Sequence, residues 1–92
     1  MATISVELPS LLHGCTKGQK EVAVEASTVQ GAIEQLLNDY PLLKNNLFEV
    51  NGARRKHVMI FFNEQNVDWL ENLNHPVTTS DRLIIVQAVA GG

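Results

Sequence analysis

The chain has 92 residues, of which 45% are hydrophobic and 18% are charged. This length and composition are typical of one small globular domain and exclude a disordered chain. Ten acidic against seven basic side chains give a net charge of −3, the opposite of the balance in a general nucleic-acid binder.

The compartment is suggested by the few cysteines and by the lack of long apolar runs. Cys15 is the single cysteine, so no internal disulfide can form, as is usual in a reducing compartment. No apolar run approaches the roughly 18–20 residues of a membrane-spanning helix. Met1 leads directly into an alternating stretch, without the pattern of a signal peptide. We therefore expect a cytoplasmic protein with neither membrane nor nucleic-acid partners.

Two alternating stretches predict the first two strands. In residues 3–8 every second residue is apolar, and Pro9 closes this strand because it cannot donate to a sheet ladder. Residues 13–19 contain two glycines and predict a turn. Residues 20–25 alternate again, so the two strands are expected to form a hairpin.

The strongest helix signal follows Thr28. Apolar side chains recur there at spacings of three and four residues, which places them on one face of a helix. These side chains are Val29, Ala32, Ile33, Leu36 and Leu37. Ser27 or Thr28 can cap the helix, and Ser27 with Gln30 matches a capping box. Pro41 predicts that the helix ends near residues 38–40.

The remaining elements are less regular. The leucine-rich segment 42–48 is expected to cover one end of the core, and Asn51-Gly52 marks a turn. Residues 58–62 are apolar throughout, which predicts a central strand buried on both faces. Residues 67–69 are interpreted as a short return strand and residues 83–86 as the last strand. A parallel central pair would explain why neither 58–62 nor 83–86 alternates.

This order of elements predicts an α+β roll. Its mixed sheet has four to five strands, with the first and last side by side and one main helix packed on one face. Residues 1–86 form the domain, and residues 87–92 are expected to form a flexible C-terminal tail.

Signals for catalysis inside the domain are weak. Cys15 is interpreted as an inert thiol, because nothing in the sequence places a base beside it. The basic run 54–57 fits a solvated loop better than a docking patch, and partial burial of Trp69 is favoured over a partner anchor. Ser80 beside Asp81 fits a turn. The three histidines are too scattered for a ligand set, so no metal site is predicted.

The end of the chain carries the strongest functional signal. Residues 87–90 have no charge, and Gly91 and Gly92 follow them. Six residues extend by at most about 20 Å, enough to reach into a pocket of another protein. Glycines lack Cβ atoms, so they can pass a narrow tunnel and leave the terminal carboxylate unshielded. Gly92 is therefore the candidate reactive residue and Gly91 its steric companion, while Gln87, Ala88, Val89 and Ala90 are candidates for partner binding.

The sequence resembles the MoaD/ThiS family of ubiquitin-like sulfur carriers over its whole length. The most specific match is residues 83–92, whose end, Val89-Ala90-Gly91-Gly92, is the family's terminal signature. The chain is most similar to the cysteine-biosynthesis type of carrier. The segments that carry this similarity are 6–12, 18–20, 27–33, the insert before Val58, Asn63-Glu64 and Val67.

The resemblance implies a β-grasp fold and a role as carrier and co-substrate, with no cofactor or metal bound by this chain. A ubiquitin-activating-type enzyme would adenylate the Gly92 carboxylate with ATP and magnesium, and a Gly92 thiocarboxylate would follow. In the cysteine branch the sulfur acceptor is an aminoacrylate on the pyridoxal phosphate of a cysteine-synthase-like enzyme, and a metalloprotease later frees the amino acid. Other relatives serve siderophore, thiamin or molybdopterin pathways.

Three alternatives remain open at this point. The chain could be the small subunit of molybdopterin synthase, a modifier joined through Gly92 to lysines, or an interaction domain whose final glycines are accidental. The sequence also departs from the family's pattern twice. Gln87 stands where relatives often carry proline, and residues 79–82 replace a Gly-Asp turn while keeping Asp81.

Overall fold

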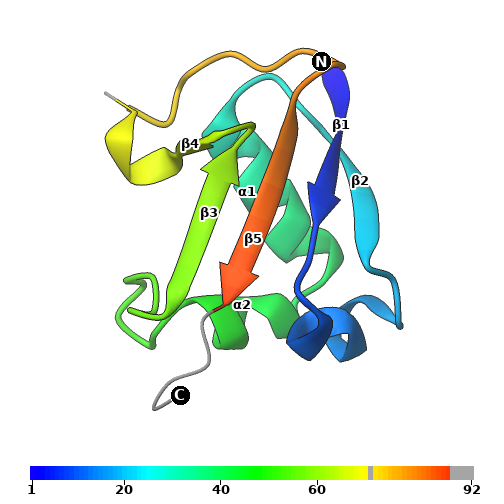
Figure 1. Ribbon diagram of the computed structural model, residues 1–92, viewed down its shortest axis with the longest axis vertical. Helices are drawn as coiled ribbons and strands as arrows, with labels where there is room; N and C mark the ends of the chain where they lie inside the picture. Colours follow the sequence, from blue (N-terminus) through cyan, green and yellow to red (C-terminus); the bar gives the residue numbers. More distant parts are fainter. Residues whose placement is uncertain (71, 88–92) are drawn as a thin grey trace.

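The computed structural model describes residues 1–70 and 72–87, and Figure 1 shows their arrangement. In chain order the elements are β1 (Ala2–Glu7), the 3-10 helix η1 (Ser10–Thr16), β2 (Glu21–Ala26), α1 (Val29–Asp39), α2 (Leu42–Leu47), β3 (Val58–Phe62), β4 (Gln65–Asn66), the 3-10 helix η2 (Val67–Trp69) and β5 (Arg82–Gln87). The predicted α+β roll, with one main helix on a mixed sheet, is confirmed.

Within the described residues, five strands form one sheet in the order β2-β1-β5-β3-β4. β1 and β2 form the predicted antiparallel hairpin, and the first and last strands lie side by side as the parallel pair β1–β5. The predicted parallel pairing of the two apolar strands is wrong, because β3 runs antiparallel to β5. The strand at the centre of the sheet is therefore β5, and β3 lies next to the short edge strand β4.

The helix α1 packs its apolar stripe against one face of this sheet (Figure 1). Its cap is Thr28, whose Oγ1 accepts a hydrogen bond from the backbone N–H of Gly31 at 3.0 Å, so the predicted Ser27–Gln30 box is wrong. A Cβ on Gly31 would lie 3.2 Å from this oxygen, which explains a glycine in the first turn. The helix ends at Asp39, within the predicted range.

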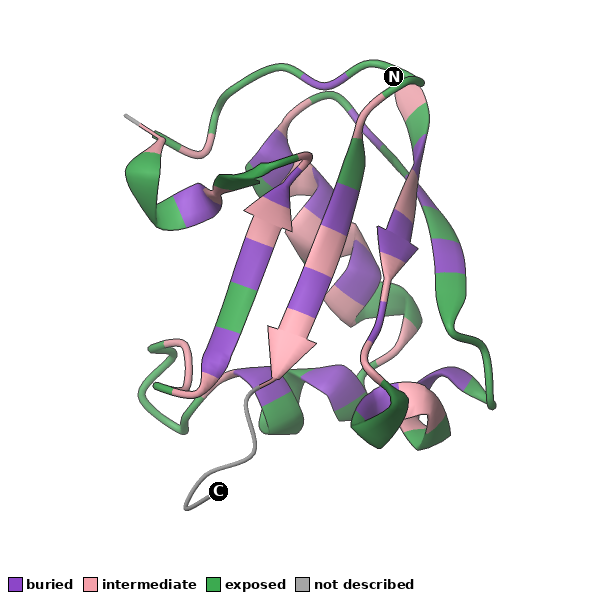
Figure 2. Ribbon diagram, viewed as in Figure 1, coloured by how far each residue is buried: buried purple, intermediate pink, exposed green. Residues whose placement is uncertain are grey.

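Burial in β3 alternates along the strand (Figure 2). Val58, Ile60 and Phe62 are buried, whereas the Met59 side chain lies on the other face and is 37% exposed. The prediction that this strand is buried on both faces is wrong. An uninterrupted apolar run does not reveal whether a second layer exists, and within the described residues α1 covers one face.

The connection between β1 and β2 contains a helix where a turn was predicted. Residues 10–16 form η1, and a turn follows at Lys17 and Gly18, both with positive φ. Thr16 is fully buried, and its hydroxyl lies 2.6 Å from the carbonyl oxygen of Gln19. This hydrogen bond satisfies a polar group that would otherwise be costly to bury.

Two further segments differ from the prediction. Part of 42–48 is the short helix α2, in which Leu43 and Leu47 are buried one turn apart and cover the core as expected, while Leu42 is exposed. The short return strand is β4, two residues earlier than predicted, and the segment 67–69 is instead η2. A strand of two residues is too short to show an alternating pattern.

Candidate functional site

The candidate site begins where β5 ends, because β5 is followed by the segment with the terminal glycines. Gln87 is the last described residue and pairs with Val58 of β3, so it belongs to the strand and the domain extends one residue beyond the predicted boundary. The predicted site residues Ala88, Val89, Ala90, Gly91 and Gly92 lie outside the described residues.

The end of β5 is held by its pairing with β3. The β1–β5 pairing runs from Ser5–Arg82 to Glu7–Ile84, whereas the β3–β5 pairing continues to Gln87. The five residues that follow Gln87 can span about 17 Å when extended.

An apolar patch lies on the face of β3 and β5 that is opposite α1. Two directly opposed cross-strand pairs, Met59–Val86 and Phe61–Ile84, form this open-face patch. All four side chains are exposed or partly exposed, because they alternate with the core residues of the same strands (Figure 2). Val86 is next to Gln87, so the patch continues to the last described residue of β5.

The open-face patch is not predicted by the sequence pattern, because an apolar run over 58–62 indicates burial of both faces of β3. A usable signal was present, since the pattern predicts one main helix, and one helix can cover only one face of a sheet. Contiguous exposed apolar side chains on a small protein are typical of an interaction surface.

Acidic side chains border the open-face patch on the β1–β2 side of the same sheet face. Glu7 lies directly opposite Glu21 in the β1–β2 register, and Glu25 follows on β2. Arg82 of β5 donates to Glu7 Oε1 at 3.2 Å, an ion pair between half-exposed side chains. This face therefore changes from acidic at β2 to apolar at β3.

The beginning of β5 is held by a polar network. The amide of Asn63 donates to Asp81 Oδ1 at 3.0 Å, and the backbone N–H of Arg82 donates to Asn63 Oδ1 at 3.0 Å. The backbone N–H of Thr78 donates to Asp81 Oδ2 at 2.8 Å. Hydrogen bonds from Asn63 and from Thr78 hold the pKa of Asp81 below its ordinary value. The prediction that Asp81 belongs to a turn is confirmed.

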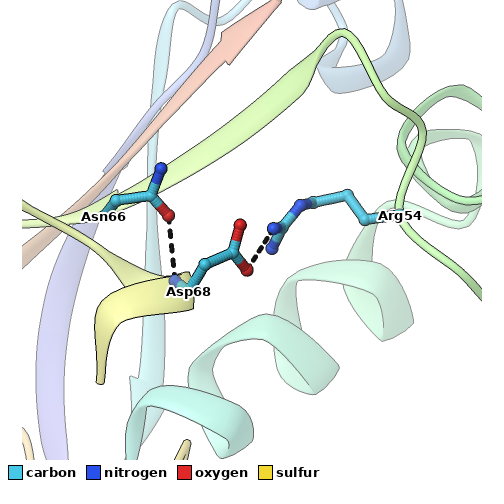
Figure 3. Close-up of polar contacts among 3 residues, drawn as sticks. All are labelled: Arg54, Asn66 and Asp68. Atoms are coloured by element: carbon cyan, nitrogen blue, oxygen red, sulfur yellow. Dashed lines mark hydrogen bonds and ion pairs between the residues drawn. The ribbon is translucent and has the colours of Figure 1, made fainter. Parts of the chain in front are cut away.

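Two members of the basic run 54–57 make structural contacts. Arg54 forms an ion pair with Asp68 of η2, whose backbone N–H also donates to Asn66 Oδ1 (Figure 3). Arg55 donates twice to the carbonyl oxygen of Asn45, at 2.9 and 3.1 Å. These contacts connect the segment before β3 to its neighbours, in agreement with the interpretation as a loop.

The other residues considered for chemistry lie outside β5. Trp69 is 72% exposed, so the prediction of partial burial is wrong; Val67 takes the core position of η2 instead. Cys15 is partly buried and accepts a hydrogen bond from the Asn46 amide at 3.3 Å. His75 packs against Phe62 with ring centroids 5.1 Å apart.

Neither a metal site nor a membrane span is found in the described part of the chain. Among residues 1–70 and 72–87, no three His, Cys, Asp or Glu side chains come together to hold a metal ion. The helices formed by these residues are too short and too polar to cross a bilayer.

The mixed sheet with β5 at its centre and α1 on one face defines the class: the protein has the ubiquitin-like β-grasp fold. Residues 6–92 match the ThiS family, and the chain belongs to that family. The sulfur carrier protein CysO of Mycobacterium tuberculosis is 29% identical over 91 residues, covering 97% of this chain and 98% of that protein.

Two solved structures show the same similarity. The BexX/CysO complex of Amycolatopsis orientalis matches at 27% identity and a TM-score of 0.80, covering 97% of this chain and 99% of that chain. The small archaeal modifier protein 1 of Methanosarcina acetivorans matches at 28% identity and a TM-score of 0.82, covering 100% and 98%. The chain is a sulfur carrier protein of the ThiS/CysO type, a co-substrate rather than an enzyme.

Proposed function

We propose that the Gly92 carboxylate is the group that carries sulfur. In the first step it attacks the α-phosphate of ATP in a partner of the ubiquitin-activating type, which holds the magnesium, and pyrophosphate leaves. A sulfide-derived sulfur then displaces AMP from the acyl-adenylate and leaves a Gly92 thiocarboxylate. The open-face patch beside the end of β5 is the observation that best supports this proposal, because it offers a docking surface at the start of the tail.

Docking on the open-face patch would bury Met59, Phe61, Ile84 and Val86 against the activating enzyme. Apolar area removed from water contributes about 25 cal/mol per Å², and aromatic or long apolar side chains commonly dominate such interfaces. With the domain held there, Ala88, Val89 and Ala90 would lie in the partner's channel, and Gly91 and Gly92 would pass its narrowest part. The catalytic groups belong to the partner, and this chain binds no cofactor of its own.

For the acceptor, we propose cysteine or a related sulfur metabolite, such as a siderophore precursor. The likeness to mycobacterial CysO over nearly the whole chain supports this choice. The acceptor enzyme would then be cysteine-synthase-like, with an aminoacrylate on pyridoxal phosphate that the thiocarboxylate sulfur attacks. A metalloprotease would finally release the amino acid from Gly92.

A second candidate is conjugation of the activated Gly92 to lysine side chains of other proteins. The likeness to the small archaeal modifier protein 1 of Methanosarcina acetivorans supports it. The two functions share the adenylation step and differ in the nucleophile that follows. Lysine-linked diglycine remnants in digests of the host proteome, absent after deletion of this protein, would favour conjugation.

The proposal is tested by combining the protein with the host's activating enzyme, ATP, magnesium and a sulfide source. Wild-type protein should gain the mass difference between sulfur and oxygen, whereas Gly92→Ala should fold normally and load sulfur at least about tenfold more slowly, because its methyl group would clash in a tunnel shaped for glycine. Normal loading of Gly92→Ala would contradict the tunnel argument. An unchanged wild-type mass would contradict the carrier proposal.

A further inference from the structure

The last residue of β5, Gln87, has a polar side chain at a core-facing position and a buried oxygen without a hydrogen-bond partner among the described residues. Gln87 occupies a core-facing position, because it alternates with the buried Leu83 and Ile85 and lies opposite the buried Val58. Its Oε1 atom is buried and has no hydrogen-bond partner among the described residues. Most buried polar groups in proteins have a partner, so each exception calls for a physical reason.

The position of Gln87 allows this amide to move. The residue as a whole is partly exposed, and it ends its strand beyond the last recorded β1–β5 pair, Glu7–Ile84. Because Oε1 has no hydrogen-bond partner among the described residues, its departure breaks no hydrogen bond of that oxygen there. An unpaired buried oxygen instead gains a partner when it reaches a donor outside.

We propose that Gln87 is a positioning residue for the tail. When the carrier docks, the Gln87 amide leaves the helix-covered face, and its oxygen accepts a hydrogen bond from an N–H donor at the entrance of the activating enzyme's channel. This inference rests on the proposed function and adds to it the residue that sets the direction in which the tail leaves the domain. The Gly92 carboxylate lies five residues further along the chain. If the chain leaves Gln87 in a fixed direction, this carboxylate samples a smaller volume.

Two substitutions separate positioning from a merely structural role. Gln87→Met keeps the length of the side chain but removes the unpaired oxygen from the buried site, so the Tm should rise by about 4 °C. The same variant cannot accept the partner's hydrogen bond, so the KM for the carrier in ATP–pyrophosphate exchange should rise about tenfold. The kcat should stay within about twofold of wild type, because the reacting group is unchanged.

Gln87→Glu is the conservative counterpart. It retains an acceptor oxygen at the same position, so its KM should stay within about twofold of wild type. Its Tm should fall, because a carboxylate is costlier to bury than an amide. The two variants should thus change the Tm in opposite directions, and only Gln87→Met should raise the KM.

Ser5→Ala is the matched control. Ser5 Oγ is the other buried oxygen without a partner among the described residues, and it lies on β1, outside the open-face patch. Removing it should raise the Tm and leave the KM unchanged. A wild-type KM for Gln87→Met, a lower Tm for Gln87→Met, or an equally raised KM for Gln87→Glu would each overturn the inference. Failure of wild-type protein to be adenylated would instead contradict the proposed function.

Discussion

The two faces of the sheet are built from neighbouring residues of the same strands, yet they differ in what covers them. On one face Ile60 and Ile85 are opposed in register and buried beneath α1 and the rest of the core. On the other face the adjacent pair Met59–Val86 has the same apolar character and is not fully buried. One face therefore stabilises the fold, and the other leaves apolar area available for a partner.

In this small domain, the apolar residues of one sheet face stabilise the fold, and those of the other face are available for binding. Burial of apolar area stabilises a fold wherever a second layer exists, whereas an exposed patch adds no such stability and favours association. If this division is correct, the same substitution at adjacent positions of β3 should have unlike consequences. Threonine suits the test because it is well accepted in strands.

The largest effect is expected for Ile60→Thr. Ile60 is 1% exposed, so this substitution replaces a buried ethyl group with a hydroxyl in an apolar core. The free energy of unfolding should fall by about 3 kcal/mol, measured by urea denaturation. A loss below about 1 kcal/mol would show that the helix-covered face is not the main source of stability.

Met59→Thr should have the converse effect. The free energy of unfolding should change by less than about 0.5 kcal/mol, because the Met59 side chain is already 37% exposed. The KM for the carrier in ATP–pyrophosphate exchange should rise about fivefold, since an apolar anchor of the open-face patch is lost.

Trp69→Ala serves as the control for Met59→Thr. It removes a larger exposed apolar side chain on η2, outside the open-face patch, and should leave the KM unchanged. If Trp69→Ala raises the KM while Met59→Thr does not, the docking surface lies at η2 rather than on the open face.

The smallest effect concerns the polar network at the beginning of β5. Asp81→Asn should lower the free energy of unfolding by about 1 kcal/mol at pH 7, because it replaces a carboxylate that accepts hydrogen bonds from Asn63 and Thr78. The folded pKa of Asp81 lies below the ordinary value of 3.8, so its contribution is complete above that pH and is lost as the pH falls through the folded pKa.

The difference in unfolding free energy between wild type and Asp81→Asn should therefore shrink below about pH 4. A difference that stays constant from pH 7 to pH 3 would show that the charge on Asp81 contributes nothing to stability. The KM for activation should be unchanged, because this network lies at the opposite end of β5 from Gln87.

The sequence predicted the elements whose patterns are long and periodic. The stripe from Val29 to Leu37 identified α1, and the alternation in the first two strands identified the hairpin, because one face of each is buried and the other is solvated. The predicted helix end near Pro41 agrees with the observed end at Asp39 for the same local reason.

The wrong predictions concern burial and strand pairing, which depend on tertiary contacts rather than on local sequence. The apolar run in β3 is compatible with either one or two covered faces, so the exposure of Met59 could not be read from it. The β3–β5 pairing is a long-range choice that no local signal specifies. The role of the terminal glycines is a prediction from steric reasoning and the family resemblance, whereas the open-face patch and the unpaired Gln87 oxygen depend on strand pairing and burial in the folded chain.

Whether Gly92 carries sulfur is tested most directly by the intact mass of the protein purified from its native host. The C-terminal fragment should be sequenced in the same experiment. We predict an increase equal to the exchange of one oxygen for one sulfur, localised to Gly92. A plain carboxylate in every preparation, unchanged after incubation with the host's activating enzyme, ATP and a sulfide source, would contradict the account.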